Sequence, residues 1–201
     1  MAYKLYKAVS DNGGGIGVEI FSGEIDALFD ELTKPQQLSG VVKNRKIFIE
    51  SDINKTVYIG IHNAGDFLPS IFTSAGANDE VVDLLGTEDK FTSVVITAST
   101  LTGFTYDNTI NPYVIFKINQ FIVYDSTLHT VGSTVDNGNG TNTVTFGVAL
   151  TTQPIVGKTI TSAIQLTLVA GVPMPFWRRN DYIAGVATSS GYNAVDLLVL
   201  D

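Results

Sequence analysis

The sequence predicts a mainly β fold: an antiparallel β-sandwich, Ig-like or jelly-roll-like, with one short helix near the N-terminus. After residue 40 the chain becomes rich in β-branched and aromatic residues that alternate or run apolar over strand lengths. Turn residues separate these runs and no helical pattern intervenes, which is typical of antiparallel sheets packed face to face. The chain has 201 residues, of which 44% are hydrophobic and 16% charged, so it is long enough and apolar enough to bury a core.

The predicted helix covers residues 22–33, SGEIDALFDELT. Ser22 is a suitable N-cap, two acidic residues stand in the first turn, and Pro35 is expected to end the helix. Four apolar residues fall at helical spacing: Ile25, Leu28, Phe29 and Leu32.

Residues 1–40 form the predicted N-terminal arm and helix. The glycine run NGGGIG, residues 12–17, lacks the Lys-Ser/Thr pair of a phosphate-binding loop, and we interpret it as a flexible arm. Tyr3, Leu5 and Tyr6 precede it and are candidate contact residues. Two interpretations stay open: the arm adds as a strand to a neighbour's sheet edge, or it is a frayed terminus.

The next runs, RKIFIES and KTVYIGIHN, predict two strands, and DIN between them resembles a hairpin turn. Lys43, Arg45 and Lys46 are interpreted as surface charges at the start of the first strand. Further strands are predicted in KFTSVVITAST, NPYVIFKINQFIVYDS, TNTVTFGVAL, SAIQLTLVA and NAVDLLVLD. Residues 135–143, VDNGNGTNT, predict a type I′ hairpin, and residues 78–90 predict either a short helical turn or a loop.

The stretch GVPMPFWRRN, residues 171–180, holds the only Trp of the chain. Its two prolines suit the start of a strand or an edge strand. In an extended chain Phe176 and Trp177 point to opposite faces, as do Arg178 and Arg179. We keep two compatible interpretations: a core aromatic beside a solvated edge, and a subunit contact, since Trp and Arg are frequent at interface hot spots.

No catalytic or metal-binding motif stands out, and we expect a protein that is not an enzyme and uses no cofactor or metal. The chain has no Cys, its two histidines, His62 and His129, lack a partner at metal-ligand spacing, and no G-x-S-x-G turn occurs. A net charge of −8 argues against nucleic acid as a partner. No apolar run predicts a membrane helix, and the first ten residues do not resemble a signal peptide.

Five short motifs, in this order, resemble a family of tailed-bacteriophage virion proteins. The motifs read SDNGGGIG, DALFDEL, SGVVKNRKIFIES, PFWRRNDYIAG and NAVDLLVLD, and the resemblance covers about residues 9–63 and 143–201. It implies a β-rich, Ig-like sandwich, which we assign to residues 41–201, with a divergent inserted β segment at about 64–142. If the strands in RKIFIES and TVYIGIHN pair with strands from residues 143–201, the two ends of the chain build one sandwich, and the central segment is an insertion or a second β lobe.

The resemblance also implies a role. The expected function is a non-enzymatic structural component of a tailed-phage virion, either a capsid decoration or cement protein or a neck- or tail-associated one. Its partners would be other virion proteins and copies of itself, in a particle assembled in the bacterial host cytoplasm. The alternative is a receptor- or carbohydrate-binding module of a tail fibre or baseplate, for which Tyr106 and Tyr113 in DNTINPYVIF are the only hint.

Overall fold

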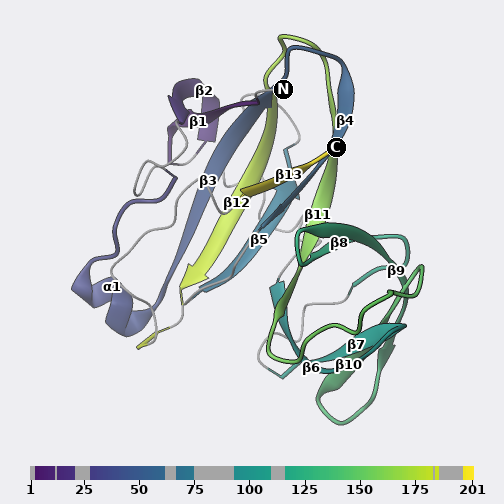
Figure 1. Ribbon diagram of the computed structural model, residues 1–201. Coiled ribbons are helices and arrows are strands. Elements are labelled where there is room, and N and C mark those ends of the chain that lie inside the picture. Colours follow the sequence, from purple (N-terminus) through teal and green to yellow (C-terminus); the bar gives the residue numbers. More distant parts are fainter. Residues whose placement is uncertain are drawn as a thin grey trace.

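The computed structural model of the chain describes residues 3–11, 13–20, 28–61, 67–74, 93–109, 116–182, 184–185 and 197–201. Antiparallel sheets pack face to face, and one short helix follows the first two strands in the sequence (Figure 1). The predicted fold class, a mainly β antiparallel sandwich with one short helix, is therefore confirmed. No helix in these ranges is long and apolar enough to cross a membrane.

The first sheet has five strands in the order β2-β1-β3-β12-β5. Their bounds are β1 (Lys4–Ser10), β2 (Gly13–Ile20), β3 (Val41–Glu50), β5 (Phe67–Thr73) and β12 (Met174–Tyr182). β12 pairs with β3 on one side and with β5 on the other, so a strand from the C-terminal part is inserted between two strands from the N-terminal part.

The second sheet has eight strands in the order β13-β4-β11-β6-β7-β10-β9-β8. Their bounds are β4 (Lys55–Ile61), β6 (Ser93–Thr100), β7 (Gly103–Asp107), β8 (Phe121–Tyr124), β9 (Thr127–Asp136), β10 (Thr141–Phe146), β11 (Thr159–Leu168) and β13 (Leu197–Leu200). β4 lies between β11 and β13. β3 pairs with β12, and β4 pairs with β11 and β13, so both early strands pair with strands from the C-terminal part and the two ends of the chain build one sandwich.

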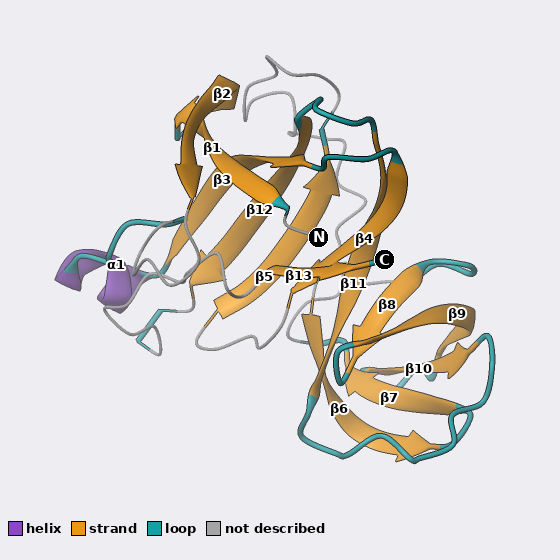
Figure 2. Cartoon of the chain, turned by 45° about the horizontal axis from the view of Figure 1, so that its top comes forward, coloured by secondary structure: helices purple, strands orange, loops and turns teal. Residues whose placement is uncertain are grey.

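β11 belongs to two structures at once. Its last residues pair with β4, whereas its first residues pair with β6 on one edge and with β8 on the other. The strands β11-β6-β7-β10-β9-β8 therefore close into a ring, which removes their free edges. Figures 1 and 2 show this ring as a rounded lobe beside the sandwich.

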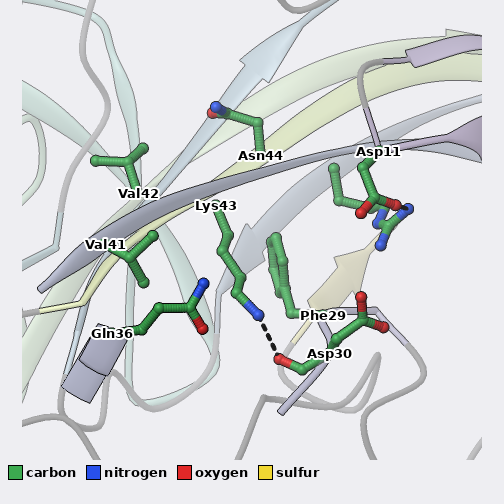
Figure 3. A pocket seen from close by; sticks show the side chains of 9 residues that line it. Asp11, Phe29, Asp30, Gln36, Val41, Val42, Lys43 and Asn44 are labelled. Atoms are coloured by element: carbon green, nitrogen blue, oxygen red, sulfur yellow. Dashed lines mark hydrogen bonds and ion pairs between the residues drawn. The ribbon is translucent and has the colours of Figure 1, made fainter. Parts of the chain in front are cut away.

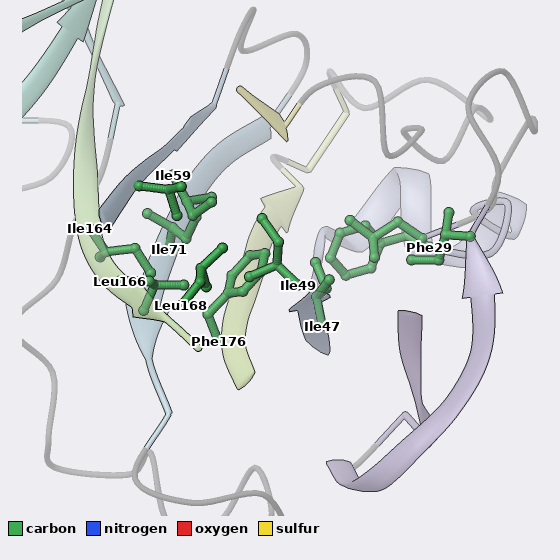
Figure 4. Packing of buried hydrophobic residues seen from close by; sticks show 12 residues of the cluster. Phe29, Ile47, Ile49, Ile59, Ile71, Ile164, Leu166, Leu168 and Phe176 are labelled. Carbon is green, nitrogen blue, oxygen red and sulfur yellow. The ribbon is translucent and has the colours of Figure 1, made fainter. Parts of the chain in front are cut away.

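Each lobe has its own apolar core. In the sandwich, inward side chains of β3, β4, β5, β11 and β12 meet between the two sheets (Figure 4). The members of this core are Ile20, Leu28, Phe29, Ile47, Ile49, Val57, Ile59, Ile71, Ile164, Leu166, Leu168 and Phe176. The ring encloses a second core, made of Val94, Ile96, Phe104, Tyr106, Phe116, Ile122, Val131, Val144, Phe146 and Ile160.

The predicted hairpin at DIN is wrong. β3 and β4 stand in different sheets, and residues 51–54 form an arch between them. The arch lies beside the β11–β12 connection, since the Gly171 amide donates to the Ser51 carbonyl at 2.9 Å and the Ala170 amide to Asn54 Oδ1 at 2.8 Å. Side-chain alternation defines the apolar face of a strand but not the strand or sheet that this face packs against. Here the apolar faces of β3 and β4 pack against each other across the sandwich.

The helix lies later than predicted. The described part of the predicted helix, residues 28–33, is not helical, and α1 (Lys34–Ser39) follows it. Pro35 stands in the first turn of α1 and does not end a helix, because a first-turn residue needs no intrahelical N–H bond. Gln36 Oε1 accepts from the Thr33 amide at 2.9 Å at the start of α1. Leu28 and Phe29 are buried as their pattern suggested, but from an irregular segment.

The glycine run is a strand and not a flexible arm. Residues 13–20 form β2, which pairs with β1 across two register shifts. Gly13 and Gly14 have φ of 116° and 82°, which glycine adopts without strain. A Cβ on Gly17 would lie 2.8 Å from the Lys7 carbonyl oxygen, so the close approach of the two backbones requires glycine there.

The predicted hairpin at residues 135–143 is confirmed, but its loop has four residues, Asn137 to Gly140, where a type I′ turn has two. In NPYVIFKINQFIVYDS only β8 is a strand among the described residues, since residues 117–120 form a turn with Asn119 at a φ of 67°. The predicted helical turn or loop at residues 78–90 lies outside the described residues.

Candidate functional site

The FWRR stretch is central in the first sheet, not at an edge. Pro173 precedes β12, and Pro175 is its second residue, where β5 is not yet paired with β12. Phe176 joins the sandwich core, and Trp177 points to the opposite face; neither is exposed. The predicted alternation of the two aromatics is therefore confirmed, whereas the predicted start or edge applies only to the prolines.

The face of the first sheet that bears Trp177 also holds a buried cation. Lys46 has no exposed surface, and its Nζ lies 5.9 Å from the Trp177 ring centroid and 5.5 Å from that of Phe48. Aromatic faces attract an ammonium group more strongly when water is excluded. The interpretation of Lys46 as a surface charge is wrong, and Arg45, only 6% exposed, is likewise inside the fold.

Arg178 faces the sandwich and is fully buried. Its guanidinium carbon lies 5.7 Å from the Phe29 ring centroid, and its Nε donates to Asn180 Oδ1 at 3.3 Å. Asn180 Nδ2 in turn donates to the Tyr182 hydroxyl at 3.1 Å. Arg179 is half-buried, opposite Asn44 in the register of β12 with β3.

Burial within one chain thus accounts for Phe176, Trp177 and Arg178. The hypothesis that these side chains contact a partner stays a prediction, and Arg179 is the only one of the four with exposed surface.

The three N-terminal candidates lie in or next to β1, which is paired on both sides within its own chain. Tyr3 and Leu5 pack against the sandwich core, and the Tyr6 hydroxyl donates to Glu50 Oε2 at 3.0 Å. Burial, followed by the Glu50 carboxylate, raises the pKa of the Tyr6 phenol. β1 is therefore neither a frayed terminus nor an arm that can add to a neighbour's sheet.

Among the described residues the two outer strands of this sheet are β2 and β5, and the edge next to the hairpin of β1 and β2 belongs to β2. The hairpin of β1 and β2 carries three exposed apolar side chains: Val9 at 68%, Ile16 at 44% and Val18 at 70% exposure. We call these three side chains and the outer edge of β2 the hairpin surface. An edge strand with exposed apolar residues is a template for pairing with another chain.

A polar hollow of about 350 Å³ lies beside this hairpin (Figure 3). Asp11 from the hairpin turn, Asp30, and Lys43 and Arg45 from β3 contribute its charged groups. Lys43 Nζ donates to the Asp30 carbonyl at 2.6 Å, Arg45 Nε donates to the Leu28 carbonyl at 2.9 Å, and Arg45 forms an ion pair with Asp11. These bonds fasten residues 28–30 and the hairpin turn to β3.

The described residues contain no cluster of His, Asp and Glu that could hold a metal ion. His62 lies outside them, and His129 stands in β9 with its ring centroid 5.5 Å from that of Phe146. Tyr106 and Tyr113 are the two residues that suggested a carbohydrate-binding surface. Tyr106 is buried inside the ring, with 1% of its surface exposed, and Tyr113 lies outside the described residues.

No protein-family model, no curated protein and no solved structure matches the chain. The resemblance to tailed-phage virion proteins therefore rests on the five motifs alone. The described parts of these motifs come together in space: the hairpin, residues 28–32, β3, β12 and β13 all belong to the sandwich lobe.

Sequence reasoning missed the hairpin surface. Ile16, Val18 and Ile20 alternate with other residues in GGGIGVEI, which is the pattern of a strand, but the glycines suggested a flexible segment. The polar hollow gave no sequence signal, because its residues come from separate parts of the chain.

Proposed function

We propose that this chain is a non-enzymatic structural component of a tailed-phage virion, either a capsid decoration or cement protein or a neck- or tail-associated one. It acts through contacts with other virion proteins and with copies of itself. The observation that carries the proposal is the hairpin surface, a strand edge that is unpaired among the described residues and is flanked by Val9, Ile16 and Val18. Such an edge binds a strand of a neighbouring subunit by backbone hydrogen bonds.

Two further features support this proposal. The five family-like motifs lie in the lobe that carries the hairpin surface. The second lobe also exposes apolar side chains, among them Leu101, Val148 and Ile155, on a chain with only 16% charged residues. Surfaces of this composition suit subunits that are covered in an assembly.

The alternative function, a receptor- or carbohydrate-binding module, needs aromatic rings exposed over a polar groove. Tyr106 is buried and its hydroxyl accepts a hydrogen bond from Asn142, so it cannot form such a platform. No other described feature favours this alternative, and we do not propose it.

The first experiment separates heads from tails of the purified particle and quantifies this chain in each by mass spectrometry. Enrichment on heads in high copy number indicates a decoration protein, and low copy number on tails indicates a neck or tail component. Absence from both fractions overturns the proposal.

A second experiment tests the hairpin surface. Val18→Lys places a charge beside the strand edge, and natural edge strands use lysine to prevent pairing. We expect this variant to fold and to incorporate poorly into particles. The matched control is Val135→Lys, which changes an exposed valine (54%) on β9 of the second lobe. Equal incorporation of the two variants contradicts a role for the hairpin surface.

A further inference from the structure

The loop between β9 and β10 contains two Asn-Gly pairs, Asn137-Gly138 and Asn139-Gly140. Asparagine followed by glycine is chemically labile, because the glycine amide nitrogen can attack the side-chain carbonyl carbon and no Cβ hinders the approach. Both asparagines are exposed to water. They differ in the hydrogen bonds that hold each reacting group.

Asn137 is held away from this reaction. Its Nδ2 donates to Thr141 Oγ1 at 2.9 Å and to Thr143 Oγ1 at 3.0 Å, so the side chain is fastened across the hairpin to β10. The attacking atom would be the Gly138 nitrogen, and its N–H donates to Asp136 Oδ1 at 2.8 Å. A carboxylate acceptor stabilises the protonated amide, and attack requires its deprotonation.

Asn139 is held mainly by its carbonyl oxygen, whereas Asn137 Oδ1 accepts a longer hydrogen bond, from Thr143 Oγ1 at 3.4 Å. Asn139 Oδ1 accepts from the Thr141 amide at 3.2 Å and from Thr141 Oγ1 at 2.7 Å, which folds the side chain back over the Gly140 peptide. Two donors on the carbonyl oxygen stabilise the negative charge that develops there during attack. In the described part of the chain no group accepts a hydrogen bond from Asn139 Nδ2 or from the Gly140 amide.

We propose that Asn139 is a site of spontaneous deamidation, selected by the fold over Asn137. The Gly140 nitrogen loses its proton to water and bonds to Asn139 Cγ; the Cγ–Nδ2 bond breaks, and Nδ2 leaves as ammonia after taking up a proton. The resulting succinimide is opened by water at either carbonyl, which gives aspartate or isoaspartate. No oxidant, reductant or enzyme is needed.

The modification adds a negative charge to a loop that directly follows Asp136, the last residue of β9. Isoaspartate also adds a methylene to the main chain, directly before the residues that pair in β10. The amide of Asn108 donates to the Gly140 carbonyl at 3.0 Å, so the change reaches the end of β7 as well. Deamidation therefore marks the age of the folded protein at one defined position.

The test incubates the purified protein at mildly alkaline pH and follows both asparagines by peptide mapping, with isotopically labelled water to identify new carboxylates. The same measurement in urea gives the reference rates of the unfolded chain. In the folded protein we expect Asn139 to react at least about tenfold faster than Asn137, a difference of about 1.4 kcal/mol in barrier height. A folded-state ratio equal to the ratio in urea overturns the proposal.

Two variants separate this geometry from general loosening of the loop. Thr141→Val keeps the shape of the side chain and removes the hydroxyl that donates to Asn139 and accepts from Asn137. We therefore expect the deamidation rate at Asn139 to fall and the rate at Asn137 to rise. Asp136→Asn removes the carboxylate from the Gly138 amide and accelerates reaction at Asn137 alone. Rates that change together in both variants, toward those in urea, contradict selection by these hydrogen bonds.

Discussion

Asn142 Nδ2 donates a 2.9 Å hydrogen bond to the Tyr106 hydroxyl in the second lobe, and both residues are almost fully buried. Asn142 Oδ1 accepts from Asn108 Nδ2 at 2.8 Å, so the amide links the hydroxyl to the end of β7. Burial is the main cause that raises the pKa of the Tyr106 phenol. Tyr106 is thus a core residue whose polar end is satisfied internally.

Asn142→Ala is expected to destabilise the protein by about 1–3 kcal/mol, because it leaves a buried hydroxyl without its donor. Tyr106→Phe is expected to cost a similar amount, and the double variant Asn142→Ala, Tyr106→Phe less than the sum of the two. Urea unfolding measures all three. Lys158→Ala, at an exposed position of the same lobe, serves as the control and should change stability by less than about 0.5 kcal/mol. Strict additivity would contradict the coupling of the two residues.

Trp177→Ala is expected to cost about 3–5 kcal/mol, since it opens a cavity in a buried site that Lys46 and Phe48 also line. Denaturant unfolding followed by far-UV circular dichroism avoids reliance on tryptophan fluorescence, which this variant lacks. Val148→Ala, at a side chain that is 78% exposed, is the comparison and should be nearly neutral. A neutral Trp177→Ala would mean that the ring is not part of the monomer core.

Removal of residues 1–15 is expected to destabilise the sandwich itself, because β1 is part of the first sheet. The deletion takes away β1, which pairs with β3, and the packing of Tyr3 and Leu5 on the core. We expect a loss of at least about 2 kcal/mol in unfolding free energy. Val9→Ser, a change at an exposed position of β1, should leave stability nearly unchanged. A truncated protein as stable as the full chain would show that β1 contributes nothing to the fold.

His129 makes the stability of the protein depend on pH. Burial lowers the pKa of its imidazole below the ordinary value of 6.5, so the folded state binds fewer protons than the unfolded state between the two pKa values. The contribution of the neutral His129 to the stability of the folded state is therefore present above pH 6.5. It is lost as the pH falls toward the pKa of His129 in the folded state. Unfolding curves of the protein and of His129→Gln across this range measure it, because His62 is common to both and cancels. Parallel pH profiles for the two proteins would contradict this assignment.

The apolar pattern predicted burial better than it predicted secondary structure. Leu28 and Phe29 are in the core as expected, although the segment that carries them is not helical. The spacing of apolar residues reports which side chains are sheltered, and an irregular segment fastened by Arg45 can shelter the same residues as a helix. Proline also fits two positions by local rules: it can follow the end of one helix or stand in the first turn of the next. The sequence alone therefore does not decide which of the two Pro35 occupies.

The strand content and the alternation of Phe176 and Trp177 follow from the sequence, because side-chain alternation and turn residues are local properties. The pairing of both chain ends was considered only under the resemblance to the phage family. Three features depended on the tertiary structure: the arch between β3 and β4, the closure of the second lobe through β11, and the burial of Lys46 between aromatic rings. Each of these features depends on which sheet faces pack together and which strand edges pair. A strand with alternating side chains is compatible with several such partners. Packing of whole sheets selects one of them, and among the described residues it leaves β2 and β5 as the two outer strands of the first sheet.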